Sequence, residues 1–204
     1  MIAIINYGMG NLQSVANILE YLKAPARITN NAEEIRDAEK LILPGVGAFN
    51  EAMMNLEQLG LISVIRECVL EDKKPFLGIC LGMQLMADTG YEGGKTSGLG
   101  LIPGEVRLMR PADTHLLLPH VGWNDVAPRS GTALYGDNLG KRVFYFVHSF
   151  AFFTREDQDI SGICYYGGQF IASIERGHIF GTQFHPEKSQ RDGIDLLKFF
   201  LAYA

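Results

Sequence analysis

The chain has 204 residues, 47% of them hydrophobic and 20% charged, which is typical of a globular protein with a sizeable core. A formal net charge of −5 excludes the basic surface expected of a protein that binds nucleic acid or an anionic membrane. No apolar run is long enough to cross a bilayer, and the first residues lack the pattern of a secretory signal. The three cysteines form no disulfide framework, so we expect a cytoplasmic protein.

In the first half of the chain, short apolar runs alternate with amphipathic segments. Residues 2–6 and 75–79 predict strands buried on both faces, and residues 40–47 predict a strand that runs into a glycine-rich loop. Residues 11–22 carry leucine and valine at helical spacing after an asparagine that is a candidate N-cap, and residues 61–69 form a second apolar helix face. This alternation favours a parallel sheet with helices on both faces.

The second half of the chain is richer in strands, which we expect at residues 143–147, 160–166, 169–174 and 178–184. Gly167 and Gly168 predict a two-residue hairpin turn between two of them. Ser189 and Asp192 form a capping-box pattern at the start of a final helix. Because no repeat or linker divides the sequence, we expect one domain over residues 1–204, an α/β fold with a parallel core and antiparallel additions.

Cys80 is the first candidate catalytic residue. It lies between Gly78 and Gly82, where a predicted strand meets a predicted helix, which is the setting of a nucleophile elbow with sulfur in place of oxygen. The free N–H groups of a helix start favour a thiolate, and the N–H of Leu81 can point at an oxyanion. The alternative is a small buried side chain, which is how we interpret the other two cysteines.

His185 is the candidate base for this nucleophile. Pro186 favours an extended backbone at His185, and side chains two apart in an extended chain point to the same side. Glu187 can therefore accept a hydrogen bond from one ring nitrogen and leave the other nitrogen for Cys80. The alternative is a surface turn with a solvated glutamate.

A second glycine-rich turn, at residues 43–49, follows another predicted strand. In a parallel sheet this strand end can share an edge with the elbow, so that a backbone N–H of Val46 or Gly47 supplies a second oxyanion donor. One such donor contributes a factor of about 100 to 1000 in rate. A simple strand–helix turn is the equally weighted alternative.

Together, the motifs PGVGAF, GICLGMQLM and FHPEKS resemble the class I (triad) glutamine amidotransferases. The resemblance implies a flavodoxin-like central sheet flanked by helices and a Cys80–His185–Glu187 triad. It also implies that glutamine is hydrolysed to glutamate and ammonia through a cysteine thioester, without a cofactor. Val46 matches the residue whose amide flips to complete the oxyanion hole.

The same resemblance implies a glutamine pocket. Gln84 matches the substrate-binding glutamine of the family, Glu92 matches an acidic position that reads the amino-acid end of the substrate, and Ser149 and Phe150 match the strand that lines the pocket. The chain departs from many relatives in having DTGYEGG where they have a Ser-Glu-Glu run, which leaves the register of Glu92 open. It also has Phe150 where tyrosine is common, so only a backbone contact would be retained there.

Within that family, the glutaminase subunits of imidazole glycerol phosphate synthases are most similar, through the segments NYGMGNLQSV, PHVGWN and YFVHSF. This likeness implies a (β/α)8-barrel cyclase subunit as the partner, which receives ammonia directly. Asn11, Trp123 and Lys188 are candidate docking residues. Core packing is the alternative for Trp123, and a solvated charge is the alternative for Lys188.

Other functions have weaker support in the sequence. Gly8 and Gly10 suggest a dinucleotide-binding turn, but Gln13 stands where the third glycine would be. A metal site is not expected, because His115 and His120 lack helical ligand spacing and no Cys-x-x-Cys occurs. The remaining rivals are another triad amidotransferase, a cysteine hydrolase of γ-glutamyl or peptide bonds, and a catalytically idle regulatory subunit.

Overall fold

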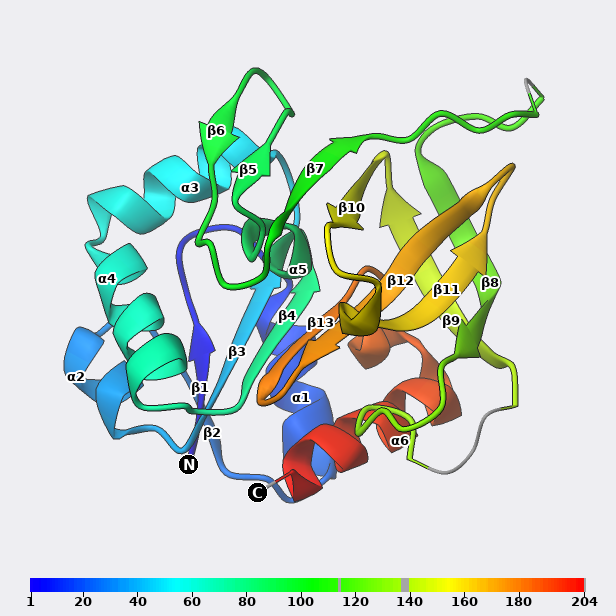
Figure 1. Ribbon diagram of the computed structural model, residues 1–204. Helices are drawn as coiled ribbons and strands as arrows, with labels where there is room; N and C mark the ends of the chain where they lie inside the picture. Colours follow the sequence, from blue (N-terminus) through cyan, green and yellow to red (C-terminus); the bar gives the residue numbers. More distant parts are fainter. Residues whose placement is uncertain (114, 137–139, 204) are drawn as a thin grey trace.

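A computed structural model describes residues 1–113, 115–136 and 140–203 (Figure 1). A nine-stranded sheet has the order β2-β1-β3-β4-β13-β12-β11-β8-β9. Its strands are β1 (Ile2–Ile5), β2 (Ala26–Thr29), β3 (Lys40–Gly45), β4 (Phe76–Cys80), β8 (His120–Pro128), β9 (Arg142–His148), β11 (Ile160–Tyr165), β12 (Gln169–Arg176) and β13 (Ile179–Thr182). A smaller sheet, in the order β10-β7-β5-β6, contains β5 (Thr89–Gly90), β6 (Thr96–Ser97), β7 (Gly104–Leu108) and β10 (Phe150–Thr154).

The helices are short and flank the large sheet. They are α1 (Leu12–Tyr21), α2 (Ala32–Asp37), α3 (Phe49–Gln58), α4 (Leu61–Arg66), α5 (Leu81–Leu85) and α6 (Gln190–Ala202). Single turns of other helical types form η1 (Glu67–Glu71), η2 (Asp157–Asp159) and η3 (Pro186–Lys188). The predicted helix face at residues 61–69 is thus divided between α4 and η1.

The large sheet is parallel in one part and antiparallel in the other. Strands β2, β1, β3, β4 and β13 pair in parallel, whereas β12, β11, β8 and β9 pair antiparallel with their neighbours. The predicted α/β fold with a parallel core and antiparallel additions is therefore confirmed. The predicted hairpin joins β11 to β12, but Tyr165 pairs with Gln169, so its loop has three residues instead of two.

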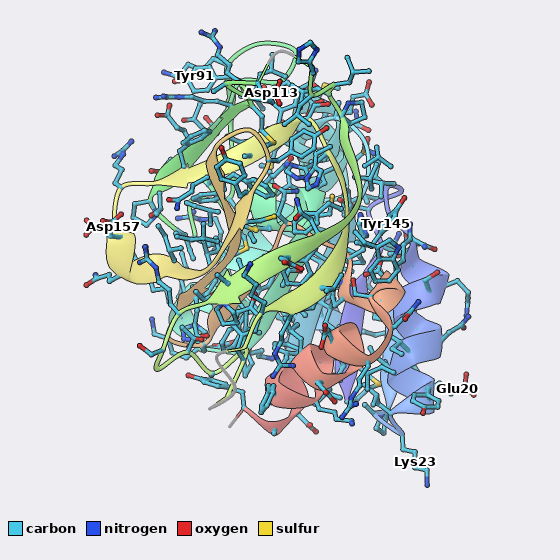
Figure 2. All side chains as sticks on the ribbon, turned by 90° about the vertical axis from the view of Figure 1, so that its right-hand side faces the viewer. Glu20, Lys23, Tyr91, Asp113, Tyr145 and Asp157 are labelled. Carbon is cyan, nitrogen blue, oxygen red and sulfur yellow. The ribbon has the colours of Figure 1, made fainter. Side chains whose placement is uncertain are left out.

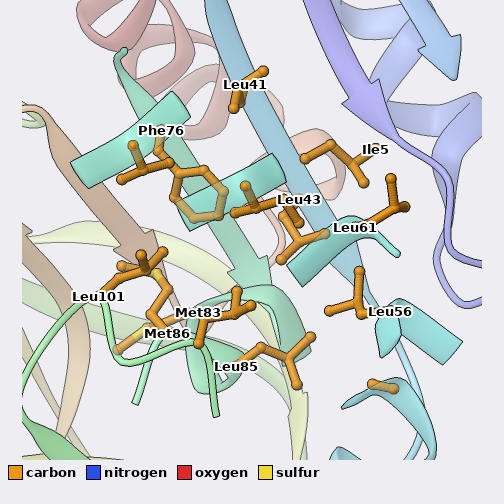
Figure 3. Close-up of a cluster of buried hydrophobic side chains, with 14 of the residues drawn as sticks. Ile5, Leu41, Leu43, Leu56, Leu61, Phe76, Met83, Leu85, Met86 and Leu101 are labelled. Atoms are coloured by element: carbon orange, nitrogen blue, oxygen red, sulfur yellow. The ribbon is translucent and has the colours of Figure 1, made fainter. Parts of the chain in front are cut away.

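Two hydrophobic cores lie on opposite faces of the parallel strands. Because successive strand side chains alternate, Ala3 and Ile5 face one core, whereas Ile2 and Ile4 face the other. Helices α2, α3, α4 and α5 cover the first face, where their side chains pack against β1, β3 and β4 (Figure 3). Helices α1 and α6 cover the second face. Strands buried on both faces explain the continuous apolar runs in the sequence.

Strand β9 forms one edge of the large sheet, and the start of α6 covers it. Ser189 precedes α6, but its hydroxyl donates to the carbonyl of His185 at 2.6 Å and accepts from the N–H of Tyr145 at 3.0 Å. Asp192 Oδ2 accepts from the N–H of Val143 at 2.7 Å. The predicted capping box is therefore wrong, because these side chains bind the free edge of β9 instead of the helix. Asn11 does precede α1, but its side chain makes no capping hydrogen bond.

Candidate active site

Cys80 is the last residue of β4 and immediately precedes α5. Its backbone has φ +54° and ψ −108°, a conformation that L-residues rarely adopt and that marks a sharp, strained turn. A Cβ at Gly82 would lie 1.7 Å from the carbonyl oxygen of Leu43, and one at Gly78 would lie 2.6 Å from that of Gly82. The glycines on both sides of Cys80 are thus required by the close approach of backbone, as an elbow predicts.

His185 and Glu187 lie on the turn that follows β13. His185 is extended, with φ −98° and ψ 96°, and its Nδ1 is 2.8 Å from Oε1 of Glu187. The structure therefore brings the two side chains together in the predicted way. The other ring nitrogen, Nε2, is buried and makes no hydrogen bond to any described residue. It is the nitrogen left for proton transfer.

The His185 ring is electrostatically coupled to both other residues of the predicted triad. Burial opposes its protonation, but the Cys80 sulfur and the Glu187 carboxylate outweigh this effect and raise the pKa of His185 to about 10. The environment therefore favours an imidazolium ring beside the sulfur at neutral pH. Such a pair is the form in which a cysteine nucleophile is active.

The sulfur of Cys80 has two further neighbours that the sequence did not suggest. The backbone carbonyl of Val147, in β9, lies 3.9 Å from Sγ, and the side-chain Nε2 of Gln183 lies 3.7 Å from it. Only pairing between segments far apart in the chain brings these groups to Cys80, and no local motif marks them.

A cavity of about 300 Å3 opens beside the sulfur. It is lined by all the residues predicted for the oxyanion hole and the glutamine pocket: Val46, Gly47, Leu81, Gln84, Glu92, Ser149 and Phe150. Pro119, Val147 and His148 complete its wall together with Cys80. The cavity thus gathers the loops after β3 and β4, the loop after β5 and the end of β9 at one edge of the sheet.

The loop with Val46 and Gly47 lies at the same sheet edge as the elbow, because Gly45 pairs with Cys80 across β3 and β4. Gly47 has φ +109°, and the side chain of Val46 is 41% exposed. Beside this loop, Tyr7 is buried, and its hydroxyl would meet a Cβ at Gly45. Burial, and to a lesser degree the nearby Cys80, raises the pKa of Tyr7, so its hydroxyl stays protonated.

Two of the predicted pocket residues, Gln84 and Glu92, have side-chain partners within the protein. Gln84 Nε2 donates to the carbonyl of Phe150 and to Oε1 of Gln183, each at 3.0 Å. Glu92 Oε2 accepts from the N–H of Phe49 at 2.9 Å and thereby binds the first residue of α3. Glu92 therefore lines the cavity and also fixes the start of a helix.

A buried pair of histidines, His120 and His148, extends from the cavity wall. His148 Nδ1 lies 2.8 Å from the carbonyl of Phe150, which can only accept, and His148 Nε2 lies 3.2 Å from Nδ1 of His120. Burial lowers the pKa of each ring to about 4, so both rings are neutral at pH 7. The two histidines pair across the neighbouring strands β8 and β9, and no local sequence pattern predicts this contact.

Two of the three candidate docking residues, Trp123 and Lys188, lie near Tyr145 in β9. The Trp123 side chain is 48% exposed, its ring centroid is 5.9 Å from that of Tyr145, and Lys188 Nζ is 5.8 Å from the same Tyr145 centroid. Helix α1, which begins after Asn11, packs against η3. In Figure 2, Tyr145 lies on the same side of the molecule as Glu20, which is near the C-terminus of α1. Trp123, Tyr145 and Lys188 thus form one surface next to the triad turn, which we call the Trp123 surface.

The described residues contain no group of three histidine, cysteine or acidic side chains placed to hold a metal ion. No helix found among them has both the length and the apolar character needed to traverse a bilayer. All three cysteines are free and buried.

The comparisons with known proteins define the class first. The sequence matches the family Glutamine amidotransferase class-I over residues 3–202, so the chain belongs to that family. Within it, the chain is 49% identical over 201 residues to imidazole glycerol phosphate synthase subunit HisH 1 of Campylobacter jejuni (strain RM1221), covering 98% of this chain and 99% of the relative. It is 52% identical over 200 residues to subunit HisH of Moorella thermoacetica, with 98% and 93% covered.

Solved structures agree with this fold. The structure of PurLQS from Thermotoga maritima matches with a TM-score of 0.77 at 18% identity, covering 99% of this chain and 97% of that one. A crystal structure of a glutamine amidotransferase matches with a TM-score of 0.74, also at 18% identity, covering 98% and 97%. At this identity the likeness concerns the fold alone.

Proposed function

We propose that this chain is the glutaminase subunit of an imidazole glycerol phosphate synthase and supplies ammonia for histidine biosynthesis. The observation that carries this function is the buried His185–Glu187 pair coupled to the sulfur of Cys80, at an elbow that opens on a cavity. The identity of 49% and 52% to HisH subunits over nearly the whole chain supports the choice within the family.

In the first half of the reaction, the Cys80 thiolate attacks the side-chain amide carbon of glutamine. The C–N bond of the resulting tetrahedral intermediate breaks, and the protonated His185 gives its proton to the leaving nitrogen, which departs as ammonia. The product that remains is a γ-glutamyl thioester on Cys80. The Glu187 carboxylate holds the ring in the orientation that this transfer needs.

In the second half, water attacks the thioester carbon and gives a proton to the neutral His185. The C–S bond breaks, glutamate leaves, and the thiolate and the imidazolium are restored. Both steps pass through an oxyanion. We assign its stabilisation to backbone N–H groups of Leu81 and of the loop at Val46 and Gly47, which line the cavity beside the sulfur.

We assign substrate binding to four other residues of the cavity lining. Gln84, Glu92, Ser149 and Phe150 line the cavity, and Glu92 carries the charge that suits the ammonium group of a glutamine substrate. The backbone carbonyl of Phe150 holds Gln84 and His148 in the pocket wall by accepting a hydrogen bond from each, and this role needs no side-chain hydroxyl.

We propose a (β/α)8-barrel cyclase subunit as the partner, docked on the Trp123 surface. Ammonia released into neutral water would become ammonium, which is a poor nucleophile, so a glutaminase that feeds a synthase gains from direct docking. The half-exposed aromatic rings next to the triad turn suit such a contact. Asn11, before α1, and Lys188 are the polar candidates at its margin. Three free cysteines fit a cytoplasmic location.

The test is glutamate release from glutamine, measured with the chain alone and with a purified cyclase subunit. We expect hydrolysis that depends on Cys80 and rises when the cyclase is added. A chain that binds the cyclase but hydrolyses no glutamine would be an idle regulatory subunit. Hydrolysis of peptide or other γ-glutamyl bonds in preference to glutamine would identify a different cysteine hydrolase.

A further inference from the structure

The carboxamide of Gln183 contacts the sulfur of Cys80, although it has no part in the triad. Gln183 follows β13 and stands two residues before His185, and none of its surface is exposed. Its backbone N–H donates to the carbonyl of Ala172 at 2.8 Å, which holds the residue in place. Its side-chain Nε2 lies 3.7 Å from Cys80 Sγ. A buried carboxamide needs hydrogen-bond partners, and the Cys80 sulfur is one of the partners of the Gln183 side chain.

The backbone carbonyl of Phe150 determines which way this carboxamide points. A carbonyl oxygen can only accept, and it lies 3.0 Å from Nε2 of Gln84, so the nitrogen of Gln84 must face Phe150. The same nitrogen lies 3.0 Å from Gln183 Oε1, which uses its second hydrogen. Gln183 therefore presents its oxygen to Gln84 and must present its NH2 group to the sulfur.

The two hydrogen-bond neighbours of the sulfur favour opposite protonation states. The Val147 carbonyl, 3.9 Å from Sγ, can only accept and therefore suits a thiol that donates its proton. The Gln183 amide can only donate at this position and therefore suits a thiolate. His185 Nε2 makes no hydrogen bond to any described residue, so Gln183 is a hydrogen-bond donor to the sulfur that stands beside the electrostatic coupling of Cys80 with the ring held by Glu187.

We propose that Gln183 is a positioning residue for the nucleophile, which donates an amide N–H to Cys80 and at the same time locks Gln84 against the pocket wall. One neutral side chain thereby links the sulfur to the substrate pocket. A neutral donor suits the position, because it favours the thiolate without adding a second positive charge beside His185. The kinetic consequence rests on the proposed glutaminase function, whereas the effect on the sulfur does not depend on the substrate.

The test is the pH profile of Cys80 alkylation by iodoacetamide in the full chain, followed peptide by peptide with mass spectrometry. Gln183→Met keeps the length of the side chain and removes both amide contacts. We expect the midpoint of the alkylation profile of Gln183→Met to lie about one pH unit above that of the wild type. At a given pH below both midpoints, the variant then has about tenfold less thiolate. Glutamine hydrolysis should lose about tenfold or more in kcat. Gln58→Met, on the exposed end of α3, is the matched control.

The other titratable groups coupled to Cys80 stay in place in this variant, which makes the comparison specific. They are His185 and Tyr7, with Glu187 and His148 acting through His185. An unchanged alkylation midpoint in Gln183→Met would overturn the proposal, even if turnover fell, because packing alone would then explain the residue.

A second variant and a separate hydrolysis assay give the test a clear outcome in every case. If Gln183→Met does not fold, Gln84→Met removes the donor that fixes the carboxamide, and an unchanged midpoint there overturns the proposal just as well. If the midpoint rises but neither protein hydrolyses glutamine, the hydrogen bond to sulfur is supported and the proposed glutaminase function fails. The Cys68 and Cys164 peptides, which are buried elsewhere, report any general unfolding.

Discussion

Nδ1 of His185 and Oε1 of Glu187 lie 2.8 Å apart, and solvent reaches only 2% and 1% of these side chains. The carboxylate therefore fixes the imidazole in an environment where neither group is solvated. Because Nδ1 is occupied, only Nε2 can exchange a proton with Cys80 or with a substrate. This division of roles gives Cys80 and Glu187 different expected effects when they are replaced.

Replacement of Cys80 by alanine should abolish glutamine hydrolysis, by at least about a thousandfold, because no other group on this edge can form the thioester. The folded chain, its complex with the cyclase and any ammonia-dependent cyclase activity should remain. Glutamate release and a cyclase assay with ammonium salts measure these two outcomes. Cys164→Ala, buried away from the cavity, is the control, and substantial hydrolysis by Cys80→Ala would remove the nucleophile assignment.

Replacement of Glu187 by glutamine should reduce kcat by about a hundredfold or more, but by less than the loss in Cys80→Ala. Glu187 orients the ring and raises the pKa of His185, but it forms no bond to substrate. Single-turnover and steady-state hydrolysis at several pH values provide the measurement. A loss greater than that of Cys80→Ala would contradict a role limited to orientation.

The histidine pair should make the fold sensitive to acid. The pKa of His120 is lowered from 6.5 in the unfolded chain to about 4, so below pH 6.5 the unfolded chain binds more protons than the folded one. The stability contribution of the neutral ring is therefore present above pH 6.5 and is lost as the pH falls toward 4. His120→Phe keeps the stacking on Phe146 and Tyr166. Between pH 7 and pH 5, the free energy of unfolding should fall by about 1–2 kcal/mol less in this variant than in the wild type.

Urea unfolding at these two pH values gives this difference directly. Tyr21→Phe, at an exposed position of α1, is a control that changes no titration in this range. Equal acid destabilisation in wild type and His120→Phe would show that the ring is already protonated, or solvated, in the folded protein.

Replacement of Trp123 by alanine should weaken the binding of the cyclase subunit by about tenfold or more, because a half-exposed aromatic ring supported by Tyr145 is a typical anchor. Hydrolysis by the isolated chain should change little. Titration calorimetry measures the affinity, with Tyr21→Ala, an aromatic ring that is 71% exposed elsewhere, as the control. Equal affinities of Trp123→Ala and wild type would place the interface on another surface.

Binding of the cyclase should raise glutamine hydrolysis, by about 100-fold to 1000-fold if it completes one oxyanion donor. The exposed Val46 and Gly47, which has a positive φ, both line the cavity, and hydrolysis without a partner would waste glutamine. Rates with and without saturating cyclase provide the measurement. Identical rates would contradict the coupling.

The sequence predicted those parts of the site that depend on local backbone geometry. The two glycines around Cys80 are required by contacts within a few residues and with the adjacent strand, and Pro186 determines the extended backbone that joins His185 to Glu187. The alternation of apolar runs and amphipathic segments predicted the parallel core for the same local reason.

Contacts between distant segments could not be predicted in this way. Gln183 reaches Cys80 only because β13 pairs with β4, and His120 reaches His148 only because β8 pairs with β9. The capping-box prediction failed for the same reason, since Ser189 finds partners outside the helix in the N–H of Tyr145, on the edge of β9, and the carbonyl of His185. The hydrogen-bond partners of these polar side chains are therefore determined by pairing between distant strands, which local sequence patterns do not predict.

The most direct test of the central claim is covalent labelling of the wild-type chain with a diazoketone analogue of glutamine, followed by identification of the modified peptide. The account predicts one label on the peptide that contains Cys80, incorporated in proportion to the loss of glutamine hydrolysis and prevented by glutamine. Complete inactivation with Cys80 unmodified, or a label on another residue, would contradict it.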